Sequence, residues 1–167
     1  MKTRTQPIGT AVIFALLLAF LTFFWACNES FQVLKVSMKT PTWVTPSDYT
    51  YKVALTIEFN HQVDITKFSA PGTVRIDLKG TRDGRTALNV AGIFKQSPDL
   101  KTVVFISDKS LSDLIKPGAG ENIEYTLIIS GTTAGIGAVT DKNGQILDGD
   151  ADGKPGGDYK KVFEVVG

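Results

Sequence analysis

The chain of 167 residues is long enough for one domain of ordinary size plus a short extra segment. Its 18 basic and 17 acidic side chains nearly balance, and no lysine-arginine cluster is interleaved with aromatic residues, which argues against nucleic acid as a partner. Cys27 is the only cysteine, so an intramolecular disulfide and a cysteine-based zinc site are excluded.

Residues 1–27 have the pattern of a membrane-targeting segment. Lys2 and Arg4 precede an uncharged apolar run that begins at Ile8, and a basic start followed by an apolar stretch is typical of an export signal. The basic end of such a segment stays inside the cell. We therefore expect residues 28–167 to form the exported domain, at the cell envelope or surface.

Three fates fit this N-terminal segment. Residues 21–27 resemble a bacterial lipoprotein signal, which implies cleavage before Cys27 and attachment of lipid to its thiol. The apolar run is also about long enough to cross a bilayer core of roughly 30 Å as a helix. A retained helix would serve as a membrane anchor or pack into the core of a pilus-like filament. A plain cleaved signal is the third alternative.

Strict alternation of apolar and polar residues dominates the chain from Phe31 onward. The clearest case is residues 51–59, where Val53, Leu55, Ile57 and Phe59 alternate with more polar neighbours. A period of two with one apolar face predicts a strand half-buried on a core. Similar strands are predicted at residues 31–38, 73–78, 88–94, 102–106, 122–129 and 160–166.

Proline, glycine and asparagine punctuate these predicted strands. Turn formers occur at residues 40–41, 45–46, 70–72, 83–84, 97–99, 117–120 and 142–144. The only stretch with helical character, residues 110–115, is too short for more than one turn. About seven short strands separated by such turns predict an antiparallel β-sandwich.

Four segments also occur in a recognisable order: residues 54–64, 111–118, 125–131 and 141–144. Together they resemble the bacterial Ig-like domains of S-layer and other cell-surface proteins, and the resemblance extends over residues 31–167. It implies an immunoglobulin-like sandwich used as a spacer or an adhesive module.

An acidic loop at residues 148–158 is the sharpest local motif. Asp148, Asp150 and Asp152 occupy alternate positions and Gly153 follows them, as in the first half of a calcium-binding loop. The backbone carbonyl of Lys154 would be the next ligand, and we expect Asp158 to close the shell. The loop is not an EF-hand, because Tyr159 stands where the bidentate glutamate would be.

The alternative to a calcium site is a solvated acidic turn. Two unit charges about 4 Å apart repel by about 1 kcal/mol in water and about 4 kcal/mol at an effective dielectric near 20. Converging three carboxylates without a cation is therefore unfavourable. We predict a structural calcium ion that stabilises the exported sandwich, because metal binding energy becomes folding energy.

The sequence contains no recognisable catalytic motif. The single histidine, His61, is expected to be a solvated turn residue, and neither a nucleophile elbow nor a phosphate-binding loop is present. We expect Trp43 and Tyr125 to be packing residues instead of carbohydrate platforms. The predicted function is a non-catalytic, lipid- or membrane-anchored module for adhesion or structure with a protein or glycan partner; the alternative is a self-assembling filament subunit.

Overall fold

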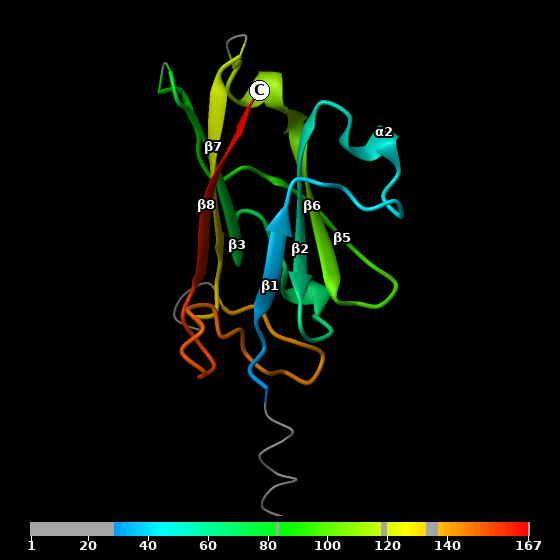
Figure 1. Cartoon of the computed structure of the whole chain (residues 1–167). Helices are drawn as coiled ribbons and strands as arrows, with labels where there is room; N and C mark the ends of the chain where they lie inside the picture. The colour runs from blue at the N-terminus through cyan, green and yellow to red at the C-terminus, as the bar shows by residue number, and fades with distance from the viewer. Residues whose placement is uncertain (1–28, 83, 118–119, 133–136, 167) are drawn as a thin grey trace, which may run out of the picture.

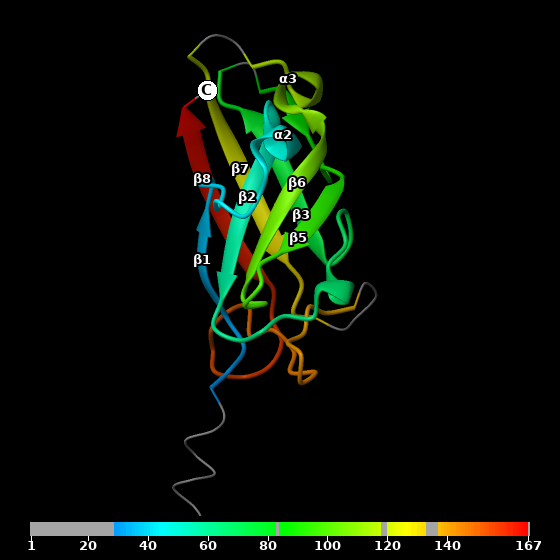
Figure 2. The ribbon, with the colours of Figure 1, turned by 90° about the vertical axis from the view of Figure 1, so that its right-hand side faces the viewer.

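The computed structural model describes residues 29–82, 84–117, 120–132 and 137–166, which form a sandwich of two four-stranded antiparallel sheets. Figure 1 shows the sandwich with the two sheets side by side, and Figure 2 turns it by 90°. The predicted antiparallel β-sandwich is confirmed, with eight strands in the described part of the chain. The predicted N-terminal helix and Cys27 lie outside the described residues.

Each sheet pairs strands that lie far apart in sequence. The first sheet has the order β1 (Val33–Ser37), β2 (Lys52–Phe59), β6 (Thr102–Ser110) and β5 (Gly92–Gln96). The second has the order β4 (Thr86–Ala87), β3 (Val74–Gly80), β7 (Asn122–Ile129) and β8 (Tyr159–Val166). Strands β2 and β7 follow the predicted alternation, because each turns its apolar residues toward the opposite sheet.

The core between the sheets is continuous and rich in phenylalanine. Rings contact one another in series from Phe31 through Phe59, Phe68 and Phe94 to Phe105, with centroid distances between 5.3 and 5.9 Å. Such aromatic pairs add to the stability that burial of their area provides. Residues from both sheets and from the entering segment therefore share one core.

A second, smaller cluster covers part of the outer face of the first sheet. Val104 and Ile106 of β6 point away from the core and are buried by Val44, with Tyr49 packed against them. Tyr49 ends the short helix α2 (Pro46–Tyr49), in the segment that follows β1 and lies outside the sandwich in Figure 1. The sequence did not predict this helix, because four residues provide no helical periodicity.

The predicted strand at residues 88–94 is wrong in its extent. Only its last three residues, 92–94, belong to a strand, β5; β4 ends before it at Ala87, and Asn89 between the two strands has a φ of 54°, which breaks the extended conformation. The chain passes from the second sheet to the first at this point, since β4 and β5 belong to different sheets. The single helical turn predicted at residues 110–115 is confirmed as α3 (Leu111–Leu114). The 3₁₀ turn η1 (Ile65–Lys67) was not predicted.

One open edge of each sheet carries features that hinder pairing with another chain. Strand β1 contains a bulge between Val33 and Lys35, and β8 exposes Lys160 and Lys161. Lys161 lies on the same side of β8 as Phe163, which packs against the core. Bulges and inward-facing charges are known protections against strand addition. These two edges therefore disfavour assembly by strand pairing.

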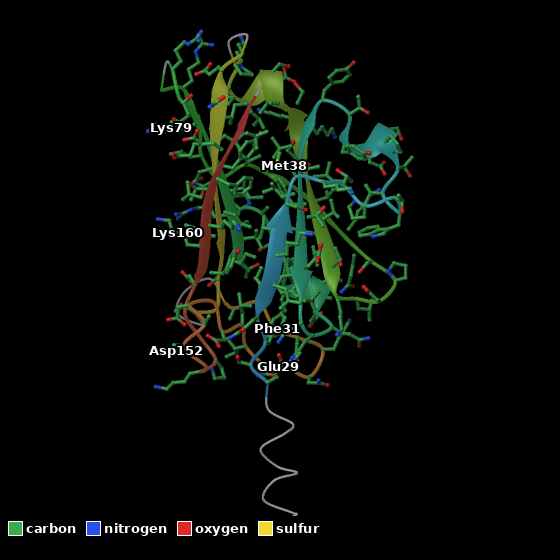
Figure 3. The ribbon with its side chains drawn as sticks, in the orientation of Figure 1. Glu29, Phe31, Met38, Lys79, Asp152 and Lys160 are labelled. Carbon is green, nitrogen blue, oxygen red and sulfur yellow. The ribbon has the colours of Figure 1, made fainter. Side chains whose placement is uncertain are left out.

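The chain enters the sandwich at the end that carries the acidic loop. Figure 3 places Glu29, Phe31 and Asp152 at this end, and Figure 1 shows β8 ending at the opposite end. Within the described residues, no helix has the length and apolar character needed to span a bilayer. The fold thus brings residues 29–32 close to a loop more than one hundred positions later.

Candidate metal centre

The acidic loop is closed by backbone hydrogen bonds at its base. Asp148 and Gly156 form a parallel bridge, the Gly149 amide donates to the Gly156 carbonyl at 2.9 Å, and the Gly156 amide donates to Leu147 at the same distance. Leu147 is fully buried in the core, and the Asp148 amide donates to the Phe31 carbonyl at 2.8 Å. The loop is therefore fixed to the sandwich on both sides.

Three of the predicted ligands converge. Asp148, Asp150 and Asp152 each offer a carboxylate oxygen, and these oxygens lie within 4.8 Å of one another. Asp148 is buried, whereas Asp150 and Asp152 are exposed. The alternating spacing thus produces the predicted convergence, with one oxygen-rich side of the group open to solvent.

Asp148 is held in place by four donors. Its Oδ1 accepts a hydrogen bond from the Asp152 amide at 3.1 Å, and its Oδ2 accepts from the Gly153 amide at 3.1 Å and from Gln32 Nε2 at 2.7 Å. The Ser30 side chain is the fourth donor. The loop amides turn back onto the first aspartate, so the second and third carboxylates are brought toward it.

These donors determine the charge of Asp148. Burial alone would raise the pKa of its carboxyl, but the hydrogen bonds from Gln32, Ser30 and the two loop amides outweigh it and hold the pKa below its ordinary value of 3.8. Asp148 is therefore ionised at neutral pH. Within the described residues, no lysine or arginine forms an ion pair with any of the three carboxylates.

The remaining lone pairs suit a hard cation. Asp152 Oδ1 accepts from the Lys154 amide at 2.8 Å, which leaves its Oδ2 free, and no donor to Asp150 is found among the described residues. The Asp150 carboxylate lies against Gly157, where a Cβ atom would come within 2.6 to 2.7 Å of it. Carboxylate oxygens without other partners are the ligands that calcium prefers, so the donor set fits this ion.

Two other predicted ligands lie nearby without joining the group of three. The Lys154 amide contacts Asp152, and the ligand role of its carbonyl stays a prediction. Asp158 Oδ1 accepts from the Gly131 amide at 3.1 Å and from Thr132 Oγ1 at 3.0 Å. Asp158 nevertheless lines a hollow of about 320 Å³ together with Asp148 and Asp150, so its role as a closing ligand also stays a prediction.

His61 was predicted to be a solvated turn residue, but the structure shows it partly buried. Its Nδ1 lies 3.2 Å from Asp141 Oδ2, its ring stacks on Phe31 at 6.0 Å, and its side chain is only 26% exposed. Asp141 is buried and its Oδ1 also accepts from the Asn143 and Gln145 amides at 2.8 Å. The pair therefore fixes the turn at residues 141–145 to the rest of the sandwich.

The close approach of two backbone segments at Gly149 leads to a testable expectation. A Cβ atom there would collide with the Tyr159 amide and the Gly157 carbonyl, both of them backbone atoms. We expect Gly149→Ala to lower the free energy of unfolding by about 2 kcal/mol, within the range of overpacking, and to weaken calcium binding. Urea unfolding with and without calcium measures both effects.

Gly153→Ala is the matched control in the same loop. Gly153 has a φ of +86°, but nothing lies within 4 Å of the position that its Cβ would take. Only the backbone strain remains, about 1 kcal/mol. Equal losses in the two variants would show that the close approach at Gly149 is not a determinant of stability.

Comparison with known proteins finds similarity among solved structures alone. No protein-family model matches this chain, and no curated protein sequence does. Among solved structures, the chain is similar to the surface layer protein SbsC, domains 1-6, with 15% sequence identity and a TM-score of 0.47. The match covers 95% of this chain and 17% of that chain, so this chain spans less than a fifth of its length.

Proposed function

We propose that this chain is a non-catalytic protein of the cell surface or envelope, anchored through its N-terminus and stiffened by a structural calcium ion. The N-terminal basic and apolar segment supports export and anchoring. The sandwich provides a compact module for adhesion or structure. The ion would be held by Asp148, Asp150 and Asp152, whose convergence is the single observation that carries the metal part of the proposal.

The position of the loop gives this ion a mechanical role. Gln32 and Phe31 bond to Asp148 from the segment that leads in from the N-terminus, and β8 follows directly after the loop. An ion bound to Asp148, Asp150 and Asp152 would therefore link the anchored end of the chain to its last strand. Since binding favours only the folded state, the domain resists unfolding at the point where an anchor transmits force.

A subunit of a pilus-like filament is the second candidate function. The length and apolar character of residues 8–27 favour it, because a retained helix of this kind packs into a fibre core. The bulge in β1 and the lysines on β8 make one edge of each sheet a poor contact for assembly. A filament would therefore be held together by the N-terminal segment, with the sandwich on its outside.

Mass spectrometry of the protein from its native envelope distinguishes these possibilities. We expect an N-terminus that begins at Cys27 and carries lipid, and we expect Cys27→Ser to release the protein from the membrane fraction. Labelling of intact cells with a membrane-impermeant amine reagent should modify the exposed lysines. An intact segment of residues 8–27 in assembled fibres would support the filament, and a cytoplasmic protein without labelling contradicts both functions.

A further inference from the structure

A groove of about 620 Å³ crosses the outer face of the first sheet, lined by residues of β1, β2, β6 and the segment that follows β1. Its floor is polar. Lys35 pairs in register with Glu58, which pairs with Thr102 on the next strand, and Ser37 pairs with Thr56. One row of charged and hydroxyl groups thus runs across the strands from Lys35 to Thr102, outside the part of the sheet that Val44 covers, whereas Thr56 beside Ser37 is buried.

The segment after β1 forms the wall of this groove. The lining residues that it supplies are Lys39, Thr40, Pro41, Thr42 and Trp43. Thr56 Oγ1 donates to the Lys39 carbonyl at 2.9 Å, and the Val44 amide donates to the Pro41 carbonyl at 3.1 Å. Since Val44 is itself buried against β6, the wall is fixed to the sheet both before and after Trp43.

Trp43 was predicted to be a packing residue, but it remains accessible although its neighbours are fixed. Its side chain is 36% exposed, in contrast to Val44 at 2%, and it lines the groove. An indole ring offers a large flat apolar surface with little conformational freedom to lose on binding. A ring that lines the same groove as the hydroxyl-bearing residues Ser37 and Thr102 matches a ligand with flat apolar faces and many hydroxyl groups. Sugar rings have both properties.

The charges of the groove indicate an anionic sugar. Lys35 Nζ lies 3.7 Å from Glu58 Oε1, so these two charges compensate each other. Lys39 is exposed, and no ion pair of its ammonium group is found within the described residues. The groove that Trp43 lines therefore has one uncompensated positive charge among its residues, with which a carboxylate of a uronic acid would form a charge-assisted hydrogen bond.

We propose that this groove binds an acidic glycan, with Trp43 stacked on a sugar ring and Lys39 paired with a sugar carboxylate. The proposal extends the proposed function by naming the chemical class of its surface partner, and its biological setting rests on that function. The binding itself involves none of residues 148–158. Loss of the metal centre and loss of the glycan site are therefore separable.

Tryptophan fluorescence tests the proposal directly. The full chain in detergent, with Trp25→Phe, contains Trp43 as its only tryptophan. We expect tetragalacturonate to change its emission in a saturable way and maltotetraose of equal length to bind much more weakly. Lys39→Gln should lower the affinity for the uronate about tenfold, which corresponds to the loss of one charged hydrogen bond. By calorimetry, Trp43→Ala should lose binding altogether.

Two variants outside the groove serve as controls. Tyr51→Ala removes an aromatic side chain that is 83% exposed, and Lys79→Gln removes a lysine on β3 of the other sheet. Both should bind the uronate as the parent does. Equal affinity for the uronate and the neutral glucan would overturn the assignment to acidic glycans. The absence of saturable binding in a protein that melts cooperatively would overturn the groove as a glycan site.

A calcium melt of the same preparation keeps the two proposals apart. A normal calcium shift without uronate binding overturns the glycan site alone. Uronate binding without a calcium shift supports the glycan site and removes the metal centre from the proposed function. Binding that Lys39→Gln and Trp43→Ala leave unchanged would place the glycan elsewhere and overturn the groove.

Discussion

Calcium is expected to raise the melting temperature of the full chain in detergent by about 10 °C when the free ion reaches about 100 times its Kd. At that ratio, binding to the folded state alone contributes about 2.7 kcal/mol, and a domain of this size gains roughly 3 to 5 °C per kcal/mol. The ion would relieve the repulsion between Asp148, Asp150 and Asp152, whose oxygens lie within 4.8 Å. Calorimetric melting at increasing calcium measures the shift.

Neutralising the exposed ligands should separate metal binding from repulsion. In chelator, Asp150→Asn and Asp152→Asn should be at least as stable as the parent, because each removes a repelling charge. In calcium, both variants should lose most of the rise in melting temperature. Asp108→Asn, at an exposed position of β6, is the matched control and should keep the full rise. A parent without any shift at millimolar calcium would identify the loop as a solvated acidic turn.

Most of the sandwich could be predicted because its physical cause is local. In β2 and β7, burial of one face imposes a period of two, which appears directly in the residues. The alternating aspartates are equally local, since spacing in a tight loop determines which side chains converge. Even so, the alternation at Leu88 predicted a strand where Asn89 turns the chain from one sheet to the other.

The remaining features depend on contacts between distant residues. Gln32 bonds to Asp148 across 116 positions, and His61 meets Asp141 across 80. Neither residue carries a local signal of its partner, because a glutamine amide or an imidazole near a turn is usually solvated. The wall that presents Trp43 likewise depends on Val44 reaching β6, which no pattern within residues 39–44 indicates.

The largest effect of a single substitution is expected at Phe105. Its side chain is fully buried in the middle of β6, between Leu55 on β2 and Phe94 on β5 in the same register. We expect Phe105→Ala to lower the free energy of unfolding by about 4 kcal/mol, since it removes buried area and leaves a cavity. Urea unfolding followed by far-ultraviolet circular dichroism, in saturating calcium, measures the loss.

The size of that cavity depends on how far the surroundings can relax. Gly92 of β5 lies so close to the Phe105 ring that a Cβ atom would collide with it, so the ring occupies space that a larger residue at position 92 would take. Two paired strands cannot move into this space without losing their register. Phe105→Leu should therefore lose only about half as much stability as Phe105→Ala. Leu88→Ala is the control at a position that is 66% exposed, and it should change the free energy of unfolding by less than about 0.5 kcal/mol. A loss at Phe105→Ala as small as that at Leu88→Ala would contradict a single core shared by both sheets.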